Sequence, residues 1–160
     1  MTVIDTTKAE TSFTIVSDFD APIERVWQLW ADPRKLERWW GPPGFPATFR
    51  RHDFTVPGIS LYGMPTDGGL PTLAAWRFLA IDAPESLEVE NGFADEAGEP
   101  VGDIPWSRVS VRLEATGGGT RQSINVEFGS TELLARMLGY GMVEGMTAAL
   151  SQTDAILKED

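Results

Sequence analysis

The side chains that could carry chemistry in this chain are few, and most of them are neutral. Cysteine is absent and His52 is the single histidine, so residue type rules out thiol catalysis and thiolate metal sites. His52 and Asp53 are adjacent on a predicted strand and therefore face opposite sides, which argues against a proton relay between them. We expect His52 at the surface or at a strand edge, and we expect no metal site.

Polar groups on the predicted inward faces offer hydrogen bonding rather than bond making. They are Tyr62, Asn91, Gln152 and Ser60, with Arg108 as a further candidate. A few such groups in an apolar pocket orient a ligand. Tyr62 is the only plausible proton donor among them, and a lone donor is weak support for catalysis. No nucleophile elbow, phosphate loop or dinucleotide fingerprint occurs, so we predict no catalytic residue and no cofactor.

Composition narrows the classes of partner. The 160 residues carry a formal net charge of −11, which argues against nucleic acid and against an anionic membrane surface. With 42% apolar residues, the chain is expected to form a single domain over residues 1–160, its first ten residues being polar and flexible. It contains no apolar run of about 18 residues and no leader-like segment, so we expect a cytoplasmic protein without membrane insertion.

Two short helices are predicted between residues 21 and 40. Pro22 and the pair Asp32-Pro33 are typical of helix starts, and the Gly-Pro-Pro-Gly sequence at 41–44 ends helix formation. Four of the six tryptophans lie here. Because adjacent residues on a helix point about 100° apart, we expect one of Trp39 and Trp40 to anchor the core and the other to lie at a pocket mouth.

The remaining elements predict an α+β fold. Alternating or apolar runs indicate strands at 11–19, 47–54, 59–64, 72–81, 87–93, 107–115 and 121–128, with a turn at Asp67-Gly68-Gly69. The acidic segment 94–105 is expected to be a mobile lid. Helical periodicity over 131–158 predicts one long C-terminal helix, the only element able to cover a curved antiparallel sheet of about six to seven strands.

Small residues in the apolar arc of that last helix raise the question of a cavity. Interior glycines cost a helix about 1 kcal/mol each, and Gly141 and Gly145 could be offset by close packing on the sheet or by lining open space. Methionine is common at adaptable binding surfaces. The predicted pocket residues are Trp39, Trp40, Ser60, Tyr62, Met64, Trp76, Phe78, Asn91, Phe93, Met137, Gly141, Met142, Gly145, Met146 and Ala149.

Four motifs carry a resemblance to a known family. They are Ala21-Pro22 through Trp39-Trp40-Gly41-Pro42; Asp53-Phe54, Pro57-Gly58 and Met64 with Asp67-Gly68; residues 81–87 followed by 93–100; and Gly141 to Met146 with Gln152, Asp154 and Leu157. From about residue 11 to its end, the chain resembles the START-like or SRPBCC superfamily and, within it, homologues of the activator of the heat-shock protein 90 ATPase. Ser60 and Thr55 depart from the pattern, standing where relatives often carry a large aromatic residue and an arginine.

The resemblance implies a helix-grip fold around a deep apolar pocket. Together with the predicted cavity, it favours a non-enzymatic protein that binds a lipid or another small, mostly apolar molecule. Two alternatives stay open: a cyclase or dehydratase that uses the same pocket, and a protein that interacts with a chaperone in the stress response. A homodimer is also left open, because fold does not determine function or assembly.

Overall fold

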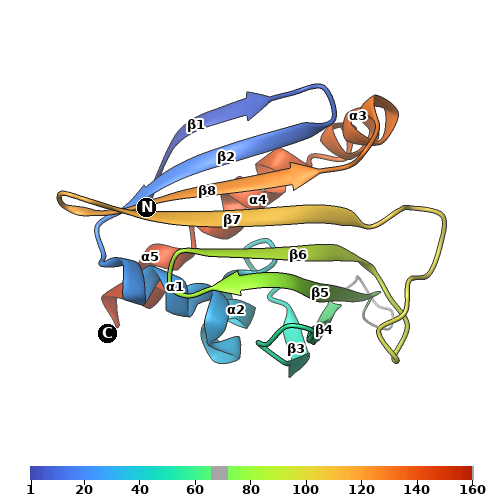
Figure 1. Ribbon diagram of the computed structural model, residues 1–160, viewed down its shortest axis with the longest axis horizontal. Coiled ribbons are helices and arrows are strands. Elements are labelled where there is room, and N and C mark those ends of the chain that lie inside the picture. The colour runs from blue at the N-terminus through green and yellow to red at the C-terminus, as the bar shows by residue number, and fades with distance from the viewer. Residues whose placement is uncertain (66–71, 160) are drawn as a thin grey trace.

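The computed structural model describes residues 1–65 and 72–159, and the turn expected at Asp67-Gly68-Gly69 lies outside them. One antiparallel sheet of eight strands dominates the described residues, in the order β1-β2-β8-β7-β6-β5-β4-β3 (Figure 1). The strands are β1 (Thr2–Lys8), β2 (Ser12–Phe19), β3 (Thr48–His52), β4 (Ile59–Met64), β5 (Thr72–Asp82), β6 (Ser86–Phe93), β7 (Ser107–Thr116) and β8 (Gly119–Glu127). Seven of these were predicted.

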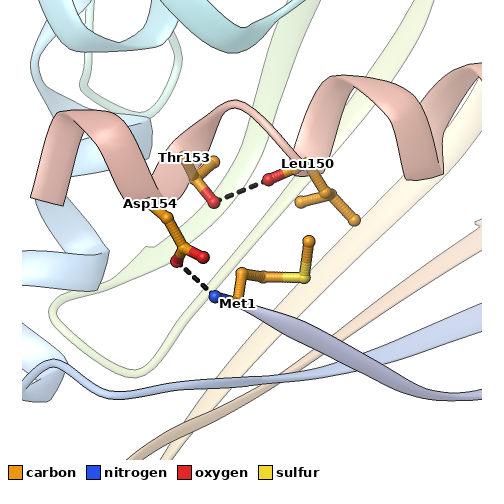
Figure 2. Close-up of polar contacts among 4 residues, drawn as sticks. All are labelled: Met1, Leu150, Thr153 and Asp154. Carbon is orange, nitrogen blue, oxygen red and sulfur yellow. Dashed lines mark hydrogen bonds and ion pairs between the residues drawn. The ribbon is translucent and has the colours of Figure 1, made fainter.

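The eighth strand, β1, corrects the expectation of a flexible N-terminal segment. It pairs with β2 at the edge of the sheet, with Thr6 opposite Ile15. Its side chains are mostly exposed, so it lacks the apolar alternation by which a strand is recognised in a sequence. The Met1 α-ammonium group forms an ion pair with Asp154 near the other end of the chain (Figure 2). Backbone pairing, which leaves no trace in side-chain pattern, therefore orders this segment.

The two short helices form where the prolines indicated. Helix α1 spans Ile23–Ala31 and α2 spans Pro33–Trp39. Asp32 is the N-cap of α2, and its side chain accepts a hydrogen bond from the Arg34 N–H at 2.9 Å. The helix pair is fixed to the sheet by Trp30, whose indole N–H donates to Oε1 of Gln122 on β8 at 2.8 Å.

The C-terminal segment is helical but is not one continuous helix. It divides into α3 (Thr131–Gly139), α4 (Met142–Leu150) and α5 (Thr153–Lys158), which together run across one face of the sheet (Figure 1). The first break falls at Gly141, whose φ of 81° is left-handed. The second precedes Thr153, whose hydroxyl donates to the Leu150 carbonyl at 2.7 Å (Figure 2). The α+β fold class is confirmed, and the expected single helix is wrong in its continuity.

Apolar side chains cover both faces of part of the sheet. The main core lies on the face that carries the helices. A smaller cluster of Leu61, Ala75 and Ala94 packs against Trp106 on the opposite face of β4 and β5. The connection between β6 and β7 therefore contacts the outer face of the sheet at both of its ends, through Ala94 and Trp106. None of the helices in residues 1–65 and 72–159 is long and apolar enough to span a membrane.

Candidate ligand-binding cavity

A cavity of about 350 Å³ lies between the sheet and helices α3 and α4. Ten of the fifteen predicted pocket residues line it: Trp40, Tyr62, Met64, Asn91, Phe93, Met137, Met142, Gly145, Met146 and Ala149. Four of the five methionines are among them. Residues from β4, β6, α3 and α4, which are far apart in the sequence, thus converge on one volume.

The other five predicted residues do not line the cavity. These are Trp39, Ser60, Trp76, Phe78 and Gly141. Ser60, Trp76 and Phe78 do point to the helical side of the sheet, but they are fully packed there, with at most 1% of each exposed. Gly141 lies at the turn before α4, where its left-handed backbone rather than open space accounts for the glycine.

An aromatic cluster fills the half of the sheet beneath α1 and α2. The ring centroids of Trp30 and Trp76 are 6.0 Å apart, and those of Phe54 and Phe78 are 5.3 Å apart. Nearer the start of β5, the small Ala74 lies two residues before Trp76 on the same face and lines the cavity. The cavity therefore begins where the side chains on this face become small and α1 and α2 no longer cover the sheet.

Trp39 and Trp40 take separate places, one of them in the core as expected. Trp39 is 2% exposed, and its indole N–H donates to the Leu29 carbonyl at 2.9 Å, so it belongs to the core. Trp40 forms part of the cavity wall. The two rings meet at 86° with centroids 5.5 Å apart, a favourable edge-to-face contact. Because Trp39 is buried in the core, its contact with Trp40 helps to hold the Trp40 ring in the cavity wall.

Eight residues that line the cavity were not predicted from the sequence. They are Gly41, Pro42, Ala74, Gly92, Ile104, Pro105, Ser107 and Phe128. Ala74 and Phe128 continue the inward alternation of their strands and could have been found by it. Ile104 and Pro105 belong to an irregular connection, in which no periodicity indicates a facing.

Gly145, the interior glycine of α4, could serve either close packing on the sheet or the lining of open space. A Cβ atom built there has no non-helical neighbour within 4 Å. At Gly92, by contrast, the same atom would lie 2.0 Å from the Trp106 ring. Gly145 lines the cavity without being needed for close packing, whereas Gly92 permits close packing against Trp106. Close packing on the sheet therefore does not account for Gly145, and its role in keeping the cavity open stays a prediction.

Tyr62 and Asn91 form the polar pair of the cavity. The Asn91 side-chain nitrogen donates to the Tyr62 hydroxyl oxygen at 2.8 Å and to the Ala75 carbonyl at 3.0 Å. Burial raises the pKa of the Tyr62 phenol, and the neighbouring N–H groups of Trp40, Asn91 and Trp76 oppose this rise. The phenol is therefore protonated at neutral pH and can donate a hydrogen bond.

Two other polar candidates have structural partners instead. The Gln152 amide donates to the Gly41 carbonyl at 2.8 Å and so fastens the C-terminal helices to the end of α2. Arg108 lies on an exposed face, where it pairs with Glu88 at 3.2 Å. Gln152 therefore stabilises the frame of the cavity, Arg108 belongs to the protein surface, and neither side chain lines the cavity.

His52 is half-buried at the end of β3, which is an edge strand of the sheet, so its expected strand-edge position holds while a fully exposed surface position does not. Its Nδ1 lies 2.6 Å from the Ser60 hydroxyl, and its Nε2 lies 3.1 Å from the Trp30 carbonyl. It thus joins β3 to β4 and to α1. Burial lowers the pKa of its imidazole, more than the hydrogen bond to the Trp30 carbonyl raises it. No group of three or more potential metal ligands occurs among the described residues.

The segment 94–105 forms one edge of the cavity. Its first half is a compact turn in which the Asp95 carboxylate accepts from the backbone N–H groups of Ala97 and Glu99. Its second half brings Ile104 and Pro105 into the cavity wall. At its end, the Trp106 indole donates to the Phe93 carbonyl at 2.9 Å. The position is that of a lid, and its movement stays a prediction.

A curved antiparallel sheet closed by C-terminal helices over an apolar cavity defines a helix-grip protein, a fold of ligand-binding type. The chain belongs to the family described as Activator of Hsp90 ATPase homolog 1-like protein, whose model matches residues 20–158. The resemblance stated from the sequence motifs is thereby confirmed.

Solved structures agree with this assignment over nearly the whole chain. A solution structure of a protein from Arthrobacter aurescens is 45% identical with a TM-score of 0.90, covering 99% of this chain and 94% of that one. A crystal structure of a protein from Mycobacterium smegmatis is 38% identical with a TM-score of 0.87, covering 97% and 96%. Comparison with functionally curated proteins gives no match.

Proposed function

We propose that this protein binds a small, mostly apolar molecule in the cavity between the sheet and helices α3 and α4, without chemical turnover. The observation that carries the proposal is the volume of about 350 Å³ lined by aromatic, aliphatic and thioether groups. This volume lies within the usual range for small-molecule sites. The thioethers of Met137, Met142 and Met146 give the helical wall a surface that can adapt to a ligand.

The glycine in the helical wall of the cavity also supports the proposal, because it lowers the stability of α4. Gly145 gives up about 1 kcal/mol of helix stability relative to alanine, although an alanine Cβ would meet no neighbour there. A helix selected for stability alone would fill this position. Keeping the volume open is consistent with an occupant that makes use of it.

An enzyme of the cyclase or dehydratase type is the second candidate. It is favoured by one observation, the protonated phenol of Tyr62 in the cavity wall, which could act as a general acid. The described lining residues include no second titratable group that could complete an acid–base pair at neutral pH. Turnover of a candidate polyketide that is abolished by Tyr62→Phe would support the enzyme.

The test of the binding function is mass spectrometry of the natively purified protein. We expect a neutral small molecule to accompany wild-type protein and to be absent from Gly145→Leu, in which the added side chain occupies the cavity. The family name refers to the heat-shock protein 90 ATPase. Copurification with a chaperone in place of any small molecule would support an interaction role and contradict the ligand-binding proposal.

A further inference from the structure

The orientation of the Asn91 amide is determined by its surroundings. Its Nδ2 lies 3.0 Å from the Ala75 carbonyl oxygen, which can only accept a hydrogen bond. Turning the amide over would place two oxygens in contact, so the nitrogen must lie on this side. The second hydrogen of the same nitrogen is directed to the Tyr62 hydroxyl oxygen at 2.8 Å.

This geometry leaves the hydroxyl hydrogen of Tyr62 free. The phenol oxygen accepts from Asn91, and the other polar side-chain groups near it are the indole N–H groups of Trp40 and Trp76, which can only donate. In the part of the chain that the structure describes, Tyr62 donates to no acceptor. Its side chain is 4% exposed, and it lines the cavity, so a missing acceptor there is costly.

The cavity wall also selects against charge. None of the lining residues in the described ranges carries a charged side chain. An ionised ligand group would lose its hydration without meeting an opposite charge, which is strongly unfavourable. The net charge of −11 therefore resides outside the cavity and does not select its occupant.

We infer that the ligand is uncharged and carries a hydrogen-bond acceptor, such as a ketone or another carbonyl oxygen, that lies against the Tyr62 hydroxyl. This inference rests on the proposed binding function and deepens it. The acceptor takes the hydrogen that the protein leaves unused, while the apolar remainder of the ligand contacts the methionines of α3 and α4. Tyr62 then supplies orientation and Asn91 holds Tyr62 in the donating geometry.

Three fluorescent naphthalenes of nearly equal shape test the inference. They are 6-acetyl-2-(dimethylamino)naphthalene, its 6-ethyl analogue without an acceptor, and the corresponding 6-carboxylate. We expect the ratio of ketone affinity to ethyl affinity to fall about tenfold in Tyr62→Phe, because the variant removes the donor but keeps the ring. The ethyl compound should bind both proteins equally, which also shows that the variant is folded.

Tyr140→Phe is the matched control, because Tyr140 is the other tyrosine of the chain and is 68% exposed. It should leave the affinity ratio unchanged. An equal ratio in wild type and Tyr62→Phe would overturn the acceptor inference while leaving the binding function intact. Carboxylate affinity equal to that of the ketone would overturn the requirement for an uncharged ligand. If wild-type protein binds none of the three probes, the proposed function fails and the inference fails with it.

Discussion

At the residue scale, Gly145 separates the stability of the protein from its capacity to bind. Gly145→Leu should reduce affinity for the acetylnaphthalene probe at least tenfold, because the new side chain enters the cavity. The free energy of unfolding should change by no more than about 1 kcal/mol, because the substitution improves helix propensity and a Cβ atom meets no non-helical neighbour. Fluorescence titration and urea unfolding measure the two quantities.

Gly139→Leu provides the control for added bulk. Gly139 also has no neighbour within 4 Å of a built Cβ atom, but it does not line the cavity. Its substitution should leave probe affinity unchanged. A strongly destabilised Gly145→Leu protein that still bound the probe normally would contradict the assignment of this residue to the cavity.

His52 should make the stability of the fold depend on pH. Burial lowers the pKa of the folded imidazole below the unfolded value of about 6.5, so folding favours the neutral form. Its stabilising contribution is complete above that unfolded value and is lost as the pH falls toward the folded pKa. The carboxylates of Asp53 and Asp32 oppose the shift and moderate this loss.

The measurement is urea unfolding of wild type and His52→Gln at several pH values between about 7.5 and 5. We expect the free energy of unfolding to fall more steeply with acidification in wild type, since glutamine has no proton to gain. Parallel curves for the two proteins would show that His52 protonation is not linked to folding.

At the scale of elements, the break between α3 and α4 depends on a single backbone conformation. Gly141 has a φ of 81°, which costs a residue with a Cβ atom about 1–2 kcal/mol. Gly141→Ala should therefore lower the free energy of unfolding by about that amount. Gly139→Ala, two residues earlier and still in α3, should lower it little or not at all.

Urea unfolding of both alanine variants compares the two positions directly. If Gly141→Ala were as stable as Gly139→Ala, the segment would be able to continue as a regular helix through residue 141. The left-handed turn would then not be required by the fold. Such a result would also remove the physical reason for two separate helices over the cavity.

At the scale of the whole molecule, the acidity of the chain and the character of its cavity are independent. The described lining residues are uncharged, so probe binding should respond to burial and hydrogen bonding. We expect the affinity for the acetylnaphthalene probe to change less than about twofold between about 50 and 500 mM NaCl, because salt screens exposed charges only. A tenfold loss would contradict binding that depends only on burial and hydrogen bonding.

Local pattern alone was enough to predict the two short helices, seven of the eight strands and the inward face of residues such as Tyr62. The Asp32-Pro33 pair begins α2 because a carboxylate caps free backbone N–H groups and proline tolerates the first helical position. Strand alternation placed Tyr62 on the inward face, since successive side chains point to opposite sides. These properties depend on residues close together in the chain, so one sequence is enough to predict them.

Tertiary structure decided which inward residues surround space and which fill it. Trp76 and Ala74 share a face of β5, yet α1 and α2 cover the first and leave the second beside the cavity. Trp39 and Trp40 could not be assigned to core and wall without the position of α2 on the sheet. β1 and the Gly141 break likewise depend on backbone pairing and backbone conformation. A cavity is bounded by segments distant in the chain, and their separation is set by packing that no local pattern encodes.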